Sequence, residues 1–184
     1  GAFEVSTNAS LTSVTAAQLV SVGGAFSLSS NTALSSNVSF QLLSSIVGDV
    51  TVFQLGQGTS LLTVGFPVLE SIGGFLDVEQ NGGVDEFSAP LLTSVGGLVD
   101  IQQNPELDVL DMGAVETIGG NLSVSQNTKL PCVGHIDELV DGCTVTGTTF
   151  IAGNGESSCS PEPDDGGVPD GGSPEPEPGD GGVD

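Results

Sequence analysis

The 184 residues of this chain include 24 Asp and Glu, one Lys and no Arg, so the formal net charge is −23. Such a surface excludes a nucleic acid partner, because nucleic acids are bound through cationic side chains that release counterions from phosphate. The charge also disfavours anionic membranes, and no apolar run approaches the roughly twenty residues needed for direct membrane insertion.

Short apolar strands recur along the chain every 23 to 26 residues. In each strand two apolar residues flank one other residue, which places both on one face. These pairs begin at Phe3, Phe26, Val50, Leu76, Val99 and Leu122. Two further apolar segments follow each strand before the next one begins. The pattern predicts an all-β fold, a right-handed parallel β-solenoid of about six coils with three sides.

Polar amides occupy the corner that follows the first strand of a repeat. Asn stands three residues after the second apolar position, at Asn8, Asn31, Asn81, Asn104 and Asn127. An amide there can satisfy backbone groups that the turn would bury unpaired. Gln54, Gln80, Gln103 and Gln126 directly precede the corner, and stacked coils would align them as a ladder. Both columns are interpreted as structural.

Glycine marks another corner, in the motifs that contain Gly48, Gly73, Gly96 and Gly119. Glycine fits a corner that needs either a positive φ or a close approach between coils. The pattern lapses once, where Leu55 replaces the corner Asn and an irregular loop runs from Gln54 to Ser60. We expect Phe53 and Leu55 to form part of a binding surface there.

The outward positions of the first strands carry a carboxylate cluster formed by Asp77, Glu79 and Asp100, with Gln102 beside it. Paired carboxylates on a β-solenoid could hydrolyse glycans or bind a divalent cation. We favour a solvated charged face that belongs to a possible binding surface, because neighbouring coils supply only Ser, Thr and Gln. No catalytic, metal or cofactor site is predicted.

The third apolar segment carries a hydroxyl column. Its members are Ser45, Ser71, Ser94 and Thr117. Ice-binding solenoids need a flat, regular array of Thr, and Glu70 and Glu116 beside this column interrupt it. We therefore expect no ice binding.

The end of the repeats contains all three Cys, between Cys132 and Cys159. This clustering indicates a terminal staple in an oxidising compartment. His135 forms a Cys-x-x-His pair with Cys132, but a zinc site needs about four ligands and the remaining Cys lack a matching spacing. We interpret His135 as a residue of the end cap.

The Leu-x-x-Val-Gly-Gly repeats, ending in Asn127-Thr-Lys-Leu-Pro-Cys132, resemble the receptor L-domain family. That family is known from the ectodomains of growth-factor receptors and from fungal and bacterial surface proteins. The resemblance implies a leucine-rich-repeat-like solenoid, a short C-terminal capping helix and a Cys132–Cys159 disulfide, with Cys143 as the odd thiol. Two departures concern the cap: Pro131 is inserted before Cys132, and Asp137 and Glu138 stand where the family has Trp.

The chain divides into two parts. Residues 1–160 are predicted to form the solenoid, with a cap over about 128–160. Residues 161–184 are rich in Pro, Gly and acidic residues and are predicted to be a disordered linker or stalk.

These features predict a non-enzymatic module, without cofactors, at the extracellular or cell surface of a bacterium. It would recognise a protein or a glycan in adhesion. The first alternative is a structural subunit that self-associates into a filament, because the first coil exposes apolar groups and an unpaired strand edge. The second is a polysaccharide-active β-helix enzyme.

Overall fold

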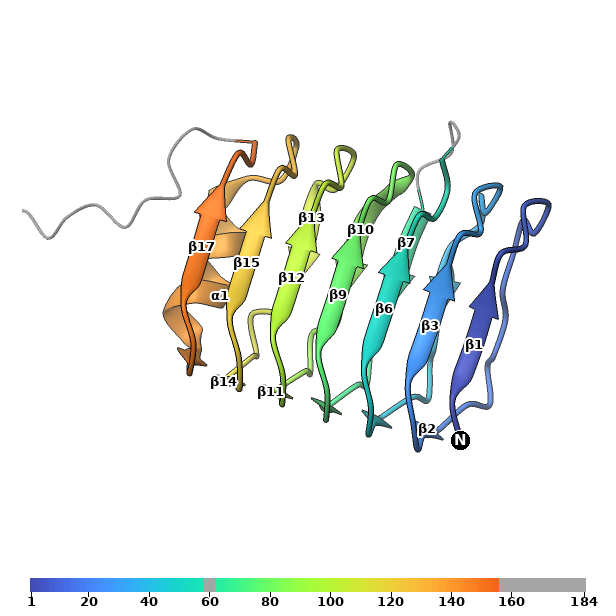
Figure 1. Ribbon diagram of the computed structural model, residues 1–184, viewed down its shortest axis with the longest axis horizontal. Coiled ribbons are helices and arrows are strands. Elements are labelled where there is room, and N and C mark those ends of the chain that lie inside the picture. The colour runs from blue at the N-terminus through green and yellow to red at the C-terminus, as the bar shows by residue number, and fades with distance from the viewer. Residues whose placement is uncertain (58–61, 156–184) are drawn as a thin grey trace, which may run out of the picture.

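A computed structural model describes residues 1–57 and 62–155 as a stack of coils with parallel strands (Figure 1). The seven-stranded sheet contains one long strand from each turn, and its strands lie side by side in the order of the sequence. They are β1 (Phe3–Ser6), β3 (Phe26–Ser29), β6 (Val50–Phe53), β9 (Leu76–Glu79), β12 (Val99–Gln102), β15 (Leu122–Ser125) and β17 (Thr149–Ala152). The predicted mostly β solenoid of about six turns is confirmed.

Shorter strands form the other two sides. The four-stranded sheet comprises β4 (Val38–Ser39), β7 (Leu62–Gly65), β10 (Val84–Ser88) and β13 (Val109–Asp111). The six-stranded sheet comprises β2 (Ser21–Val22), β5 (Ser45–Ile46), β8 (Ser71–Ile72), β11 (Ser94–Val95), β14 (Thr117–Ile118) and β16 (Thr144–Val145). Every pairing is parallel, and corresponding repeat positions face one another, as in the Val99–Leu76 pair.

One short helix lies near the C-terminal end. The irregular segment η1 (Cys132–Ile136), whose helical path is broken at Val133 and Gly134, leads into α1 (Asp137–Gly142). Ile136 and Leu139 are buried there, and η1 packs against β13. The predicted short helix is therefore confirmed, whereas Cys159 and the boundary at residue 160 lie outside the described residues.

The core is a continuous apolar column along the axis, because the alternating residues of every strand point inward. In the coils between the first and the last these side chains are almost fully buried, as Phe26, Val50 and Val99 illustrate at 0% exposure. In the last coil Val145 and Ile151 are partly exposed. Phe40 and Phe66 lie in the same core, with ring centroids 5.4 Å apart in a stacked arrangement.

The amide corners hold adjacent coils together. Asn104 is completely buried. Its Oδ1 accepts hydrogen bonds from the backbone N–H and the Nδ2 of Asn81, both at 3.0 Å, and its own Nδ2 donates to the Val78 carbonyl at 2.9 Å. Asn127 binds Asn104 in the same way. Asn154 continues the series by accepting from Asn127.

The residue before each amide corner has a positive φ although it is not glycine. These residues are Thr7, Ser30, Gln54, Gln80, Gln103 and Gln126, with φ between 51° and 59°. A left-handed conformation costs an ordinary residue roughly 1–2 kcal/mol. In five of these turns the hydrogen bonds of the Asn that follows hold the chain in this conformation. Gln54 is followed by Leu55, whose backbone N–H donates to Asn81 Oδ1.

The Gly corners are required by close approach, not by a positive φ. A Cβ on Gly96 would lie 2.2 Å from the carbonyl oxygen of Gly73, and a Cβ on Gly119 would lie 2.1 Å from that of Gly96. No side chain fits such a contact with backbone. Of the two explanations for these glycines, a positive φ and a close approach between coils, the structure supports the close approach.

Candidate binding surfaces

The carboxylate cluster lies at the centre of the outward face of the seven-stranded sheet. Asp77 and Asp100 face each other in register on β9 and β12, and Glu79 pairs in the same way with Gln102. Gln102 Nε2 donates to Asp100 Oδ2 at 3.1 Å. The Oδ1 atoms of Asp77 and Asp100 are buried and have no hydrogen-bond partner among the described residues.

This environment disfavours ionisation of Asp77. Burial first, and then the negative charges of Glu79 and Asp100, raise the pKa of Asp77 from 3.8 to about 6. The protonated acid is thus more stable in the folded protein than in a free chain. Such a group could donate a proton to a bound molecule, but within residues 1–57 and 62–155 no three His, Cys, Asp or Glu side chains are placed to hold a metal ion.

Leu55, which replaces Asn at one corner, does not form part of a binding surface as expected. The Leu55 side chain is completely buried and takes no part in a surface, because it occupies the inward corner position that Asn fills in other coils. Its backbone N–H donates to Asn81 Oδ1 at 3.0 Å. Phe53 is half-buried and lies in register with Glu79 on the outward face. Residues 58–60 of the irregular loop lie outside the described residues.

The Gln column forms only one amide link. Gln54 Nε2 donates to Gln80 Oε1 at 3.3 Å, and Gln80 Nε2 donates to Glu79 at 3.2 Å. No hydrogen bond joins the side chains of Gln80, Gln103 and Gln126 to one another within the described chain. Their shared property is the left-handed turn, not a continuous ladder.

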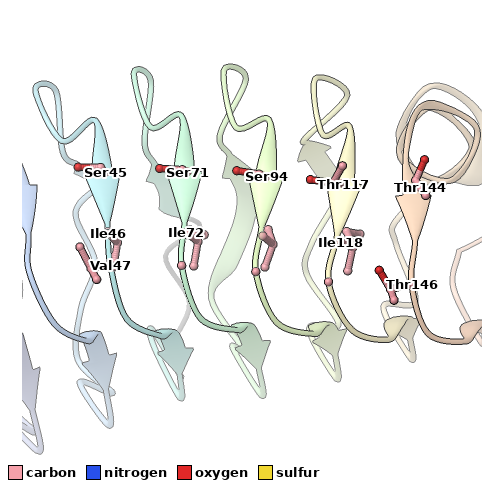
Figure 2. A pocket seen from close by; sticks show the side chains of 14 residues that line it. Ser45, Ile46, Val47, Ser71, Ile72, Ser94, Thr117, Ile118, Thr144 and Thr146 are labelled. Carbon is pink, nitrogen blue, oxygen red and sulfur yellow. The ribbon is translucent and has the colours of Figure 1, made fainter.

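A groove of about 510 Å³ runs along the six-stranded sheet (Figure 2). One wall is the hydroxyl column, which Thr144 extends beyond Ser45, Ser71, Ser94 and Thr117. Beside it the equivalent positions of five coils are Val47, Gly73, Gly96, Gly119 and Thr146. The three central positions have no side chain, so bare backbone forms the floor of the groove.

The length of the groove follows from the coil spacing. From Val47 to Thr146 there are four steps between coils, or about 19 Å at the usual distance between strands. An extended peptide of about six residues would span it. Glu70 and Glu116 are exposed next to the hydroxyl column, so the groove disfavours anionic ligands. The sequence identified the hydroxyl column but not the groove, because the groove exists where glycines from neighbouring coils leave space beside that column.

The cap residues have structural partners. His135 Nδ1 lies 3.2 Å from the carbonyl oxygen of Leu110, and since a carbonyl only accepts, this nitrogen carries the proton. Cys143 is a free, half-buried thiol whose pKa is raised by burial. Cys132 is buried, and its pairing with Cys159 stays a prediction because Cys159 is outside the described residues.

The remaining features of the described chain are few. Lys129 forms an ion pair with Glu106, and the hydrogen bond and charge of Glu106 raise the pKa of Lys129. Over residues 1–57 and 62–155, no helix has the length and apolar character to cross a bilayer.

No protein-family model, no curated protein and no solved structure matches this chain. The parallel solenoid is observed in the structure itself. The resemblance to receptor L domains stays a prediction that is based on the repeat and cap motifs alone.

Proposed function

We propose that this chain is a non-enzymatic extracellular or cell-surface module that recognises an extended ligand, a glycan or a segment of a protein, in adhesion. The observation that supports it is the groove on the six-stranded sheet, which offers similar contacts from each of five consecutive coils. In this proposal the module resembles L domains, is secreted, and carries the Cys132–Cys159 disulfide at its end.

The chemistry of the groove favours an uncharged glycan as the first ligand to test. Hydroxyls from Ser71, Ser94 and Thr117 can donate to and accept from sugar hydroxyls at each coil. The glycine floor allows a sugar ring to approach the backbone closely. The net charge of −23 repels anionic polymers, so an anionic glycan is a poor candidate.

The positions of the carboxylates support binding without catalysis. Glycoside hydrolysis needs a carboxylic acid and a carboxylate on either side of the bond that breaks. Asp77, with its raised pKa, and Asp100 lie on the seven-stranded sheet, and neither lines the groove. A ligand in the groove would therefore not contact them.

The test is a comparison of uncharged and anionic glycans by array and then by calorimetry with the 184-residue chain. We expect an uncharged linear glycan to bind and to be recovered at its original length. Ser94→Tyr should fill the groove and reduce affinity at least about tenfold. Ser123→Tyr is the matched control, because Ser123 is also a half-buried outward serine, but on the seven-stranded sheet.

Three results would refute the proposal in different ways. Shortened glycan products would indicate an enzyme. Equal loss of binding in Ser94→Tyr and Ser123→Tyr would place the ligand elsewhere. Failure of all glycans, followed by failure of purified extracellular matrix and surface proteins, would remove the recognition role.

A further inference from the structure

One position in the row of residues on the floor of the groove carries an apolar side chain. In successive coils the backbone N–H at this position donates to a carbonyl of the preceding coil, from Val47 to Val22 at 2.9 Å and from Gly73 to Ile46 at 2.8 Å. The positions are therefore equivalent, and Val47 stands where the next three coils have glycine. Its side chain is 67% exposed, so it projects from the sheet and does not pack in the core.

The first coil has the same residue types as the groove but does not line it. Ser21 lies in register with Ser45 and continues the hydroxyl column, and Gly23 matches Val47 in the floor row. Both Ser21 and Gly23 are exposed, yet the groove is lined only from Ser45 and Val47 onward. Figure 2 shows Val47 at one end of the floor row and Thr146 at the other, with only glycines between them. The Val47 side chain therefore separates the first coil from the groove.

The open floor of the groove extends over only three coils. From Gly73 to Gly119 there are two steps between coils, or about 10 Å at the usual distance between strands. At the two ends Val47 and Thr146, which are branched and similar in size, rise from the floor. One pyranose unit of an extended glycan is about as long as one step of about 4.8 Å, so three units fill the floor. A longer chain has to leave the floor or end against a side chain.

We propose that Val47 is a stop that limits the ligand to a short segment of a linear glycan, seated on the coils of Gly73, Gly96 and Gly119. The inference rests on the proposed function, because it takes the ligand to be an uncharged glycan in the groove. It adds the length of the bound segment and its register on the stack. At the Val47 end the ligand meets methyl groups, which offer no hydrogen bond to a further sugar.

Removing the Val47 side chain should join the first coil to the groove. In Val47→Gly the floor runs without interruption from Gly23 to Gly119, and Ser21 extends the hydroxyl column beside it. The floor then covers five coils, two more than in the parent. A longer glycan segment can lie on it, with hydroxyls beside each added sugar.

The test measures affinity against ligand length by calorimetry with the 184-residue chain. The probes are cello-, N-acetylchito-, manno- and laminari-oligosaccharides from the disaccharide to the hexasaccharide, all of them linear and uncharged. In the parent the affinity should rise up to the trisaccharide and then stay level. In Val47→Gly it should rise up to the pentasaccharide, which should bind at least about tenfold more tightly than it binds the parent, whereas trisaccharide affinity should change less than about twofold.

Three further variants identify the cause of the gain. Val47→Thr keeps a branched side chain of nearly the same size and should keep the trisaccharide limit. Val133→Gly is the matched control for the added backbone freedom, because Val133 is similarly exposed, at 73%, and lies outside the groove. Ser21→Tyr should have no effect in the parent and should abolish the gain in Val47→Gly, because only the opened groove reaches Ser21.

The outcomes separate this inference from the proposed function. A parent that binds the pentasaccharide at least about tenfold more tightly than the trisaccharide would overturn the inference, whether or not Val47→Gly folds. The same length limit in the parent and Val47→Gly, or the same gain in Val133→Gly, would also overturn it and leave the proposed function standing. If no oligosaccharide series binds, the inference falls, and the purified extracellular matrix and surface proteins then decide the proposed function.

Discussion

Replacing Asn104 by Ala tests the physical role of the buried amide column. The substitution removes three hydrogen bonds and leaves the backbone N–H and Nδ2 of Asn81 and the carbonyl of Val78 without this partner. Each buried polar group left unpaired costs about 1–3 kcal/mol. Water that enters the vacated space can satisfy part of this demand, so we expect a loss of about 3 kcal/mol in the free energy of unfolding.

The measurement is urea denaturation followed by circular dichroism. Asn8→Ala is the matched control, because Asn8 lies in the first coil and is exposed, and its lost bonds can be replaced by water. We expect Asn8→Ala to cost less than about 1 kcal/mol. A loss below 1 kcal/mol for Asn104→Ala, or equal losses for both variants, would show that the amides do not hold the coils together.

Three further predictions concern the corners and the carboxylate cluster. Gly96→Ala forces a Cβ to within 2.2 Å of a backbone oxygen and should lower the free energy of unfolding by about 3 kcal/mol in thermal or urea unfolding. Gly23→Ala is the control and should be tolerated, because the nearest contact of its Cβ is at 3.4 Å. Equal effects of the two substitutions would contradict the close-approach argument. Gln103→Gly should leave the free energy of unfolding within about 1 kcal/mol of the parent, because it relieves a positive φ but raises the conformational entropy of the unfolded chain. Gln103→Val should be clearly destabilising, because a β-branched residue is strained at a positive φ. Similar stabilities for the two variants would count against strain at this corner. Because the folded-state pKa of Asp77 is raised from 3.8 to about 6, the free energy of unfolding should fall as pH rises between those values and stay level above pH 6. The pKa shift sets an upper bound of about 3 kcal/mol on this loss, and solvent screening of the partly exposed group reduces it to about 1 kcal/mol. In urea titrations at pH 7, Asp77→Asn should recover that amount. Parallel pH profiles of stability for parent and variant would refute the prediction.

Sequence periodicity was sufficient to predict the strands and the core. Alternation at Leu76/Val78 and Val99/Ile101 specifies which side chains point inward, and the fixed spacing to Asn81 and Asn104 places the amides at a corner. The same three-residue spacing from Ile151 leads to Asn154, a further corner amide that the predicted Asn column does not contain.

Other features depend on what lies next to a residue in the adjacent coil, which spacing within one repeat does not reveal. The left-handed turn at Gln103 has no glycine to mark it, since the stabilising hydrogen bonds come from the following Asn and the next coil. Leu55 was expected on a surface, but a corner position that has a coil on both sides is buried whether Asn or Leu occupies it. The groove arises where Gly73, Gly96 and Gly119 align, and alignment is a property of the stack.

The groove is built from one similar step per coil, so the number of coils encoded in the gene sets its length. Residues 76–98 and 99–121 are consecutive coils of equal length that pair in register through β9, β12 and β15. Duplication of such a segment in the gene would add one hydroxyl, one glycine and about 4.8 Å to the groove without disturbing any existing corner. Ligand length could therefore be matched by gain or loss of whole coils, a simpler genetic change than remodelling a loop-built pocket.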